Sequence, residues 1–235
     1  MSALAKTSGS ADPASAARES PPGGDWAAEA EARLLGAMLE RAPDLGWTWR
    51  AAYAAGADCG FSRGDVELIA PGGPADLAAL WSRACDRAAI AALAGVDPET
   101  PKIRARIRAG ALARIAAAME SEAATRRWTG FLALPTHAPL ALRLCWESAD
   151  AIWRWAGDVA TDSNHYSKRA LLAGILAGAL AVRLARDEAA AEAHLDRGIA
   201  RVMAFERLKG RFRGLELGRR AAEAAGRLRF GALGR

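Results

Sequence analysis

Residues that build metal and catalytic sites are scarce in this 235-residue sequence. The three histidines, His137, His165 and His194, stand far apart, so none forms the His-x-x-x-His pair of a helical zinc site. The sequence also lacks Glu-x-x-His, which di-iron carboxylate bundles use twice, and the G-x-G-x-x-G, Walker A and G-x-S-x-G motifs. It therefore predicts no cofactor, no catalytic residues and no enzyme; an unrecognised hydroxylase is the weakest alternative.

Long hydrophobic runs are absent as well. The longest, Ala170–Val182, has 13 residues, whereas a helix that spans a bilayer needs about 20. The N-terminus lacks the apolar segment of a secretory signal peptide. The three cysteines are odd in number and form no Cys-x-x-Cys motif, which fits a reducing compartment. These features predict a cytoplasmic protein.

β-branched residues are few, whereas Ala and Leu are abundant, and this balance favours helices over strands. Apolar residues recur at helical spacing over residues 77–93, 103–119, 140–156 and 170–184. The sequence predicts an all-α fold, a helical bundle of about nine or ten helices. The predicted divisions are a disordered tail (1–24), a helical domain (25–206) and a basic C-terminal segment (207–235).

Residues 46–70 have the order of a helix-turn-helix, with two short helices before a long one, as in TetR-type repressors. Phosphate contacts require cations on such a head. Residues 25–70, however, hold four basic residues against eight acidic ones, a net charge of −4. The sequence predicts a degenerate head that does not bind nucleic acid, and a TetR-like transcriptional regulator remains the alternative.

A dense polar block, "GDVATDSNHYSKR" at 157–169, separates two apolar stretches. Three explanations are open: a catalytic or metal site, a helix cap, or a docking surface. A cap needs only one residue, such as Asp162 or Asn164. The surplus of polar groups favours a docking surface that also contains a cap.

The formal net charge of +5 is concentrated at the C-terminus, because residues 206–235 hold nine Lys or Arg against three Asp or Glu. Phe205, Leu208, Phe212 and Leu215 recur there at helical spacing, and Arg211 lies off that stripe. This is the pattern of an amphipathic helix at a membrane surface, although several glycines weaken it. We predict a membrane-contact segment that is frayed in water and helical on anionic lipid; a merely solubilising tail is the alternative.

Three stretches carry a resemblance to a known family: "GWT" at 46–48, "FLALPTHAPLALRLCWESADAIWRWAGDVATDSNHYSKRALLAGI" at 131–175, and "VMAFERLK" at 202–209. They resemble the coenzyme Q biosynthesis accessory family of lipid-binding proteins (the "Coq-nine" family). The resemblance implies a TetR-like fold, a pocket for isoprenoid lipid such as a ubiquinone precursor, a membrane-contacting C-terminal helix and a homodimer. It also implies that the protein helps demethoxyubiquinone hydroxylase to reach its apolar substrate, at the cytoplasmic side of a bacterial inner membrane.

Residues are predicted for three surfaces, of which the resemblance assigns the first and the apolar pattern the other two. The resemblance places partner docking at Asp162, Asn164, His165, Tyr166, Lys168 and Arg169, where the family usually has tryptophan in place of His165. The residues predicted to line or border the lipid pocket are Trp146, Ile152, Trp153, Leu172, Ile175 and Leu176. Ordinary core packing would explain these apolar residues equally well. The predicted membrane-contact residues are Phe205, Leu208, Arg211, Phe212 and Leu215.

Overall fold

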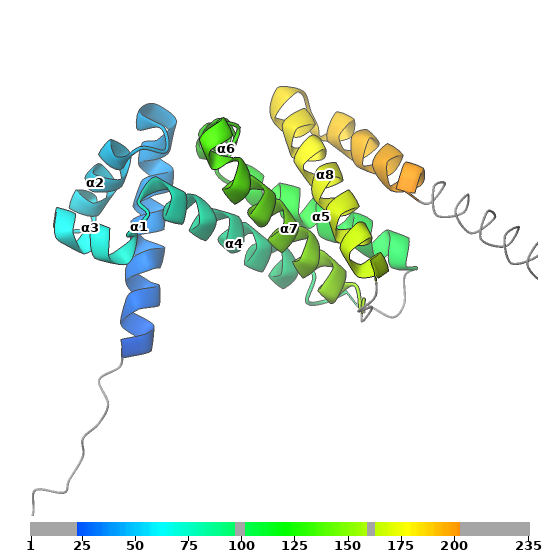
Figure 1. Cartoon of the computed structure of the whole chain (residues 1–235), viewed down its shortest axis with the longest axis horizontal. Helices are drawn as coiled ribbons and strands as arrows, with labels where there is room; N and C mark the ends of the chain where they lie inside the picture. Colours follow the sequence, from blue (N-terminus) through cyan, green and yellow to red (C-terminus); the bar gives the residue numbers. More distant parts are fainter. Residues whose placement is uncertain (1–22, 97–101, 159–162, 203–235) are drawn as a thin grey trace, which may run out of the picture.

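The computed structural model describes residues 23–96, 102–158 and 163–202, which form helices and short connections without a β-strand (Figure 1). The helices are α1 (Gly23–Leu45), α2 (Trp49–Asp58), α3 (Arg63–Ile69), α4 (Pro74–Ala92), α5 (Ile103–Met119), α6 (Glu122–Leu132), the 3-10 helix η2 (Pro135–His137), α7 (Ala138–Trp155) and α8 (Ser163–Ala185). Residues 188–202 are helical as well. The predicted all-α, TetR-like helical bundle is confirmed. The first helix begins at Gly23, slightly before the predicted domain start, and residues 1–22 and 203–235 lie outside the described residues.

The first three helices form a head at one end of the molecule, where α2 and α3 pack against α1 (Figure 1). At the start of α2, the side chain of Thr48 accepts a hydrogen bond from the Ala51 main-chain N–H. α3 starts with a capping box formed by Ser62 and Asp65. Gly73 has a φ of 58°, a conformation that favours glycine, and turns the chain into α4. These local signals produce the predicted order of two short helices before a long one.

α4 leads from the head into a body that contains α5, α7, α8 and residues 188–202 (Figure 1). One apolar core joins the head to α4 and α6 around Leu77, and a second lies among the body helices around Ile107. α6 packs against the head, where Trp47 donates its indole N–H to the Ala124 carbonyl at 3.1 Å. None of the helices described is both long enough and apolar enough to cross a bilayer.

Gly110 sets the distance between α5 and α7. A Cβ atom at this position would lie 2.7 Å from Cγ2 of the buried, β-branched Ile152, so the helices would have to separate. We expect Gly110→Ala to lower the free energy of unfolding by about 1–3 kcal/mol. Gly130→Ala is the control, because a Cβ there has open space within helix α6. It should raise stability by about 0.5–1 kcal/mol. Urea unfolding in which both variants change stability in the same direction would contradict the close α5–α7 contact.

Candidate functional site

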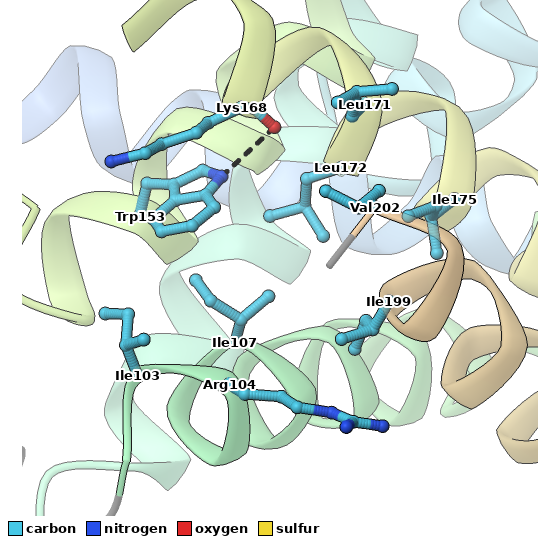
Figure 2. Close-up of a pocket in the computed structure, with 10 residues that line it drawn as sticks. All are labelled: Ile103, Arg104, Ile107, Trp153, Lys168, Leu171, Leu172, Ile175, Ile199 and Val202. Atoms are coloured by element: carbon cyan, nitrogen blue, oxygen red, sulfur yellow. Dashed lines mark hydrogen bonds between the residues drawn. The ribbon is translucent and has the colours of Figure 1, made fainter. Parts of the chain in front are cut away.

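An open pocket with apolar walls lies between α5, α7, α8 and residues 188–202 (Figure 2). We call it the apolar pocket; its empty volume, with the open mouth included, is about 430 Å³. Its lining residues are Ile103, Arg104, Ile107, Trp153, Lys168, Leu171, Leu172, Ile175, Ile199 and Val202. All except Arg104 and Lys168 are apolar. Apolar walls of this kind suit a hydrocarbon chain, and Arg104 and Lys168 add two cations to the lining.

Lys168 and Trp153 together form one side of the apolar pocket (Figure 2). The Trp153 indole N–H donates to the main-chain carbonyl of Lys168 at 3.3 Å. The Lys168 ammonium lies 5.2 Å from the centre of the Trp153 ring and 3.1 Å from Oδ1 of Asp158. These contacts hold the indole between α7 and α8 as a fixed part of the wall, with a cation beside its face.

Three of the predicted pocket residues, Trp153, Leu172 and Ile175, line the apolar pocket. Helix 103–119 is one of the four apolar helices expected to form the pocket, but the predicted lining residues do not include Ile103 and Ile107, which form its opposite wall. These two residues lie on the apolar stripe of residues 103–119, but such a stripe does not reveal which neighbouring helix it faces.

The other three predicted pocket residues lie elsewhere. Ile152 is 2% exposed and belongs to the core, and Trp146 stacks on the ring of Tyr166. Leu176 lines a different pocket. None of these three residues lines the apolar pocket, and their assignment to a lipid pocket stays a prediction. Leu176 lies one helical turn after Leu172 on the same side of α8, and at that height the helix borders the other pocket.

The predicted docking residues surround the start of α8. Tyr166 is 64% exposed, and its ring centre lies 6.0 Å from that of Trp146 on α7. These two aromatic rings form a surface that spans both helices, while Lys168 lies at the pocket edge. Outside the described residues lie Asp162 and the side chains of Asn164 and His165.

Arg169 is buried, with 1% of its surface exposed, so its side chain is not part of the exposed surface around Tyr166, and its docking role stays a prediction. Its Nε donates to Oδ1 of Asp150 at 2.6 Å, and its Nη1 donates to Oδ2 of Asp158 at 3.1 Å. A buried guanidinium requires such partners. Arg169 therefore connects α8 to Asp150 of α7 and to Asp158, which also bonds to Lys168.

The carboxyl group of Asp158 has a pKa below its ordinary value. Burial by itself would raise this pKa, but hydrogen bonds and charges from Lys168 and Arg169 lower it by more. The ionised group therefore stabilises the fold above the ordinary carboxyl pKa of about 4, and this stabilisation is lost as the pH falls through the lower folded-state pKa.

We expect Asp158→Asn to lower the free energy of unfolding by about 1–3 kcal/mol at pH 7. Urea titrations should show that the difference in free energy of unfolding between wild type and variant becomes small below about pH 4. A difference of the same size at pH 7 and below about pH 4 would contradict the stabilising role of the ionised Asp158.

Most arginine side chains of the head form contacts with other residues of the head. Arg41 bonds to Asp58 at 2.6 Å, and Arg33 donates to a main-chain carbonyl at 2.7 Å. The Arg63 guanidinium lies 5.0 Å from the centre of the Tyr53 ring. The helix-turn-helix geometry is thus present, but three of the four basic side chains of residues 25–70 contact neighbours in the head.

Across the ranges that the structure describes, no three His, Cys, Asp or Glu side chains gather as a metal site would require. The predicted membrane-contact residues lie beyond these ranges: Phe205, Leu208, Arg211, Phe212 and Leu215.

Comparison with protein families gives a match over residues 138–206, and the matching family is COQ9. This range begins at α7, includes α8 and contains the aromatic surface. We call residues 138–206 the COQ9-matching segment. This segment supplies Trp153, Lys168 and most other residues of the apolar pocket, whereas the α5 wall precedes it.

Curated relatives match a short stretch of the chain. "Ubiquinone biosynthesis protein COQ9-A, mitochondrial" of Xenopus laevis is 46% identical over 46 residues, which is 20% of this chain and 14% of that protein. The COQ9 protein of Rattus norvegicus is 45% identical over 49 residues, or 21% of this chain and 16% of that protein. The aligned stretch thus spans less than a fifth of each of these relatives. Their names describe ubiquinone biosynthesis proteins and state no enzymatic activity.

Proposed function

We propose that this protein is a non-catalytic accessory protein of ubiquinone biosynthesis. It binds an isoprenoid quinone precursor in the apolar pocket and presents it to demethoxyubiquinone hydroxylase at a membrane surface. The observation that carries this proposal is the apolar pocket, whose walls come mainly from the COQ9-matching segment. The proteins with similar sequences are named for ubiquinone biosynthesis.

The walls of the apolar pocket suit an isoprenoid tail. Branched aliphatic side chains such as Ile107, Leu172 and Ile175 surround it, and burial of apolar ligand surface gains about 0.8 kcal/mol per methylene-sized group. Arg104 and Lys168 add cations at the edge, where a polar head group can remain close to water. Binding therefore requires no chemical reaction from the protein.

Presentation of the lipid requires a partner surface close to the pocket. Trp146 and Tyr166 supply an aromatic surface, and aromatic residues are enriched at protein–protein contact sites. Tyr166 precedes Lys168, a pocket-lining residue, by two positions on α8. A hydroxylase that contacts Tyr166 would therefore lie within one helical turn of the pocket edge.

The connection to a membrane rests on the sequence that follows the apolar pocket. Val202 lines this pocket, and Phe205, the first apolar residue of the amphipathic pattern, follows three positions later. Cations in this segment would favour an anionic leaflet by roughly 1 kcal/mol each. We place the protein as a homodimer at the cytoplasmic face of a bacterial inner membrane, which lets the lipid pass between the bilayer and the pocket.

Deletion of the gene followed by quinone analysis tests this function. The deletion strain should accumulate demethoxyubiquinone and lose ubiquinone, and wild-type protein supplied in trans should restore the normal profile. A normal quinone profile in the deletion strain would contradict the proposed function.

The head supports a second candidate, a TetR-like regulator, because α2 and α3 have the helix-turn-helix order. Against it stands the net charge of −4 over residues 25–70. Binding to genomic DNA that weakens steeply with salt would favour the regulator.

A further inference from the structure

A second pocket lies where the two apolar cores meet, with walls from α4, α5, α6, α7 and α8. It shares no lining residue with the apolar pocket, and its empty volume, with the open mouth included, is about 840 Å³. Its apolar walls include Trp128, Leu144, Leu176 and Leu180. Unlike the apolar pocket, it contains a buried charged group, Arg114 of α5.

Arg114 is 6% exposed and anchors a polar cluster at the wall of the second pocket. Its Nε donates to Oδ1 of Asp86 at 2.5 Å, and its Nη2 donates to Oγ of Ser82 at 3.2 Å. The Ser148 hydroxyl donates to the same oxygen of Asp86 at 2.7 Å. The carboxylate therefore balances the charge of the guanidinium, and the cluster is neutral as a whole.

One donor of this cluster remains available. No described residue accepts a hydrogen bond from Nη1 of Arg114, and this atom is not among the fully enclosed atoms that lack a partner. Arg114 lines the second pocket, so its guanidinium borders the cavity. Cys145, another lining residue, has a pKa raised by burial, so its thiol adds no charge at neutral pH.

We propose that the second pocket binds a neutral molecule that carries a carbonyl or ether oxygen on an apolar body. The oxygen accepts a hydrogen bond from Nη1 of Arg114, and the apolar body packs against Trp128 and Leu176. An anion is disfavoured because Asp86 already neutralises Arg114. A hydrocarbon without an acceptor would leave the buried donor unsatisfied. This site does not depend on lipid binding in the apolar pocket.

Three ring compounds of similar size test this preference: acetophenone has a carbonyl, ethylbenzene has no acceptor, and benzoate is an anion. Binding is measured from the methyl NMR signals of Leu144 and Leu176 in the full-length protein. We expect acetophenone to bind about tenfold more tightly than ethylbenzene or benzoate, the effect of one hydrogen bond to a charged donor. Equal binding of acetophenone and ethylbenzene, tighter binding of benzoate, or no binding of acetophenone would each overturn the proposal.

Two variants locate the binding site. Arg114→Met combined with Asp86→Leu removes the ion pair without leaving a lone buried charge, and it should abolish the preference for acetophenone over ethylbenzene. Ala177→Trp changes an exposed residue at the pocket wall and leaves the polar cluster intact. It should block acetophenone even where the double variant does not fold. Unchanged acetophenone binding by the folded Ala177→Trp protein would overturn the assignment to the second pocket.

Discussion

Replacing Arg169 with leucine is expected to lower the free energy of unfolding by about 3–5 kcal/mol, because Asp150 and Asp158 lose their buried partner and keep only a more exposed one, Arg154 or Lys168. The side chains of Asp150 and Asp158 are 18% and 8% exposed, so water cannot replace the guanidinium effectively. This is the largest effect on stability that we predict. Urea unfolding of purified protein at pH 7 measures it.

Arg154→Leu is the matched control, because Arg154 bonds to the same carboxylate, Asp150, at 2.8 Å but is 75% exposed. Exposed ion pairs contribute little to stability, so the free energy of unfolding of this variant should fall by at most about 1 kcal/mol. Similar losses for Arg154→Leu and Arg169→Leu would show that burial of the guanidinium does not determine the strength of the α7–α8 connection.

Leu171→Glu is expected to weaken the binding of isoprenoid lipid by at least about tenfold, since a carboxylate at the pocket wall must lose water when the lipid enters. Leu171 lines the apolar pocket and is 40% exposed, so the glutamate can be hydrated in the unliganded protein and the fold should persist. Binding of a fluorescent or radiolabelled polyprenyl quinone measures the effect.

Leu142→Glu is the control for this substitution, because Leu142 is 74% exposed on α7 and lines neither pocket. It should bind lipid as the wild type does. Equal binding by Leu171→Glu and wild type would show that the hydrocarbon chain does not pass Leu171.

The helices could be predicted from sequence because their apolar stripes and end signals are local. The breaks at Thr48, Ser62 and Gly73 correspond to residues that cap or turn the chain, and these divided the head correctly. The pocket was harder to predict. Trp153 and Ile175 line the apolar pocket, whereas Ile152, the neighbour of Trp153, is buried in the core.

Arg169 and Arg114 show a second limit of sequence reasoning. The family resemblance groups Arg169 with Tyr166 in one docking surface, and the usual exposure of charged residues gives no reason to separate them. Its burial depends on Asp150, which lies 19 positions earlier in the chain, as well as on Asp158. Arg114 likewise pairs with Asp86, 28 positions away. Such pairs arise from the packing of separate helices, which local periodicity does not specify.

The central claim is that the apolar pocket holds an isoprenoid tail, and native mass spectrometry of the purified wild-type protein tests it most directly. We expect a folded protein that retains an isoprenoid lipid, which is released on denaturation and identified by its fragments. Folded protein that carries no isoprenoid, even after incubation with polyprenyl quinone in anionic vesicles, would contradict the account.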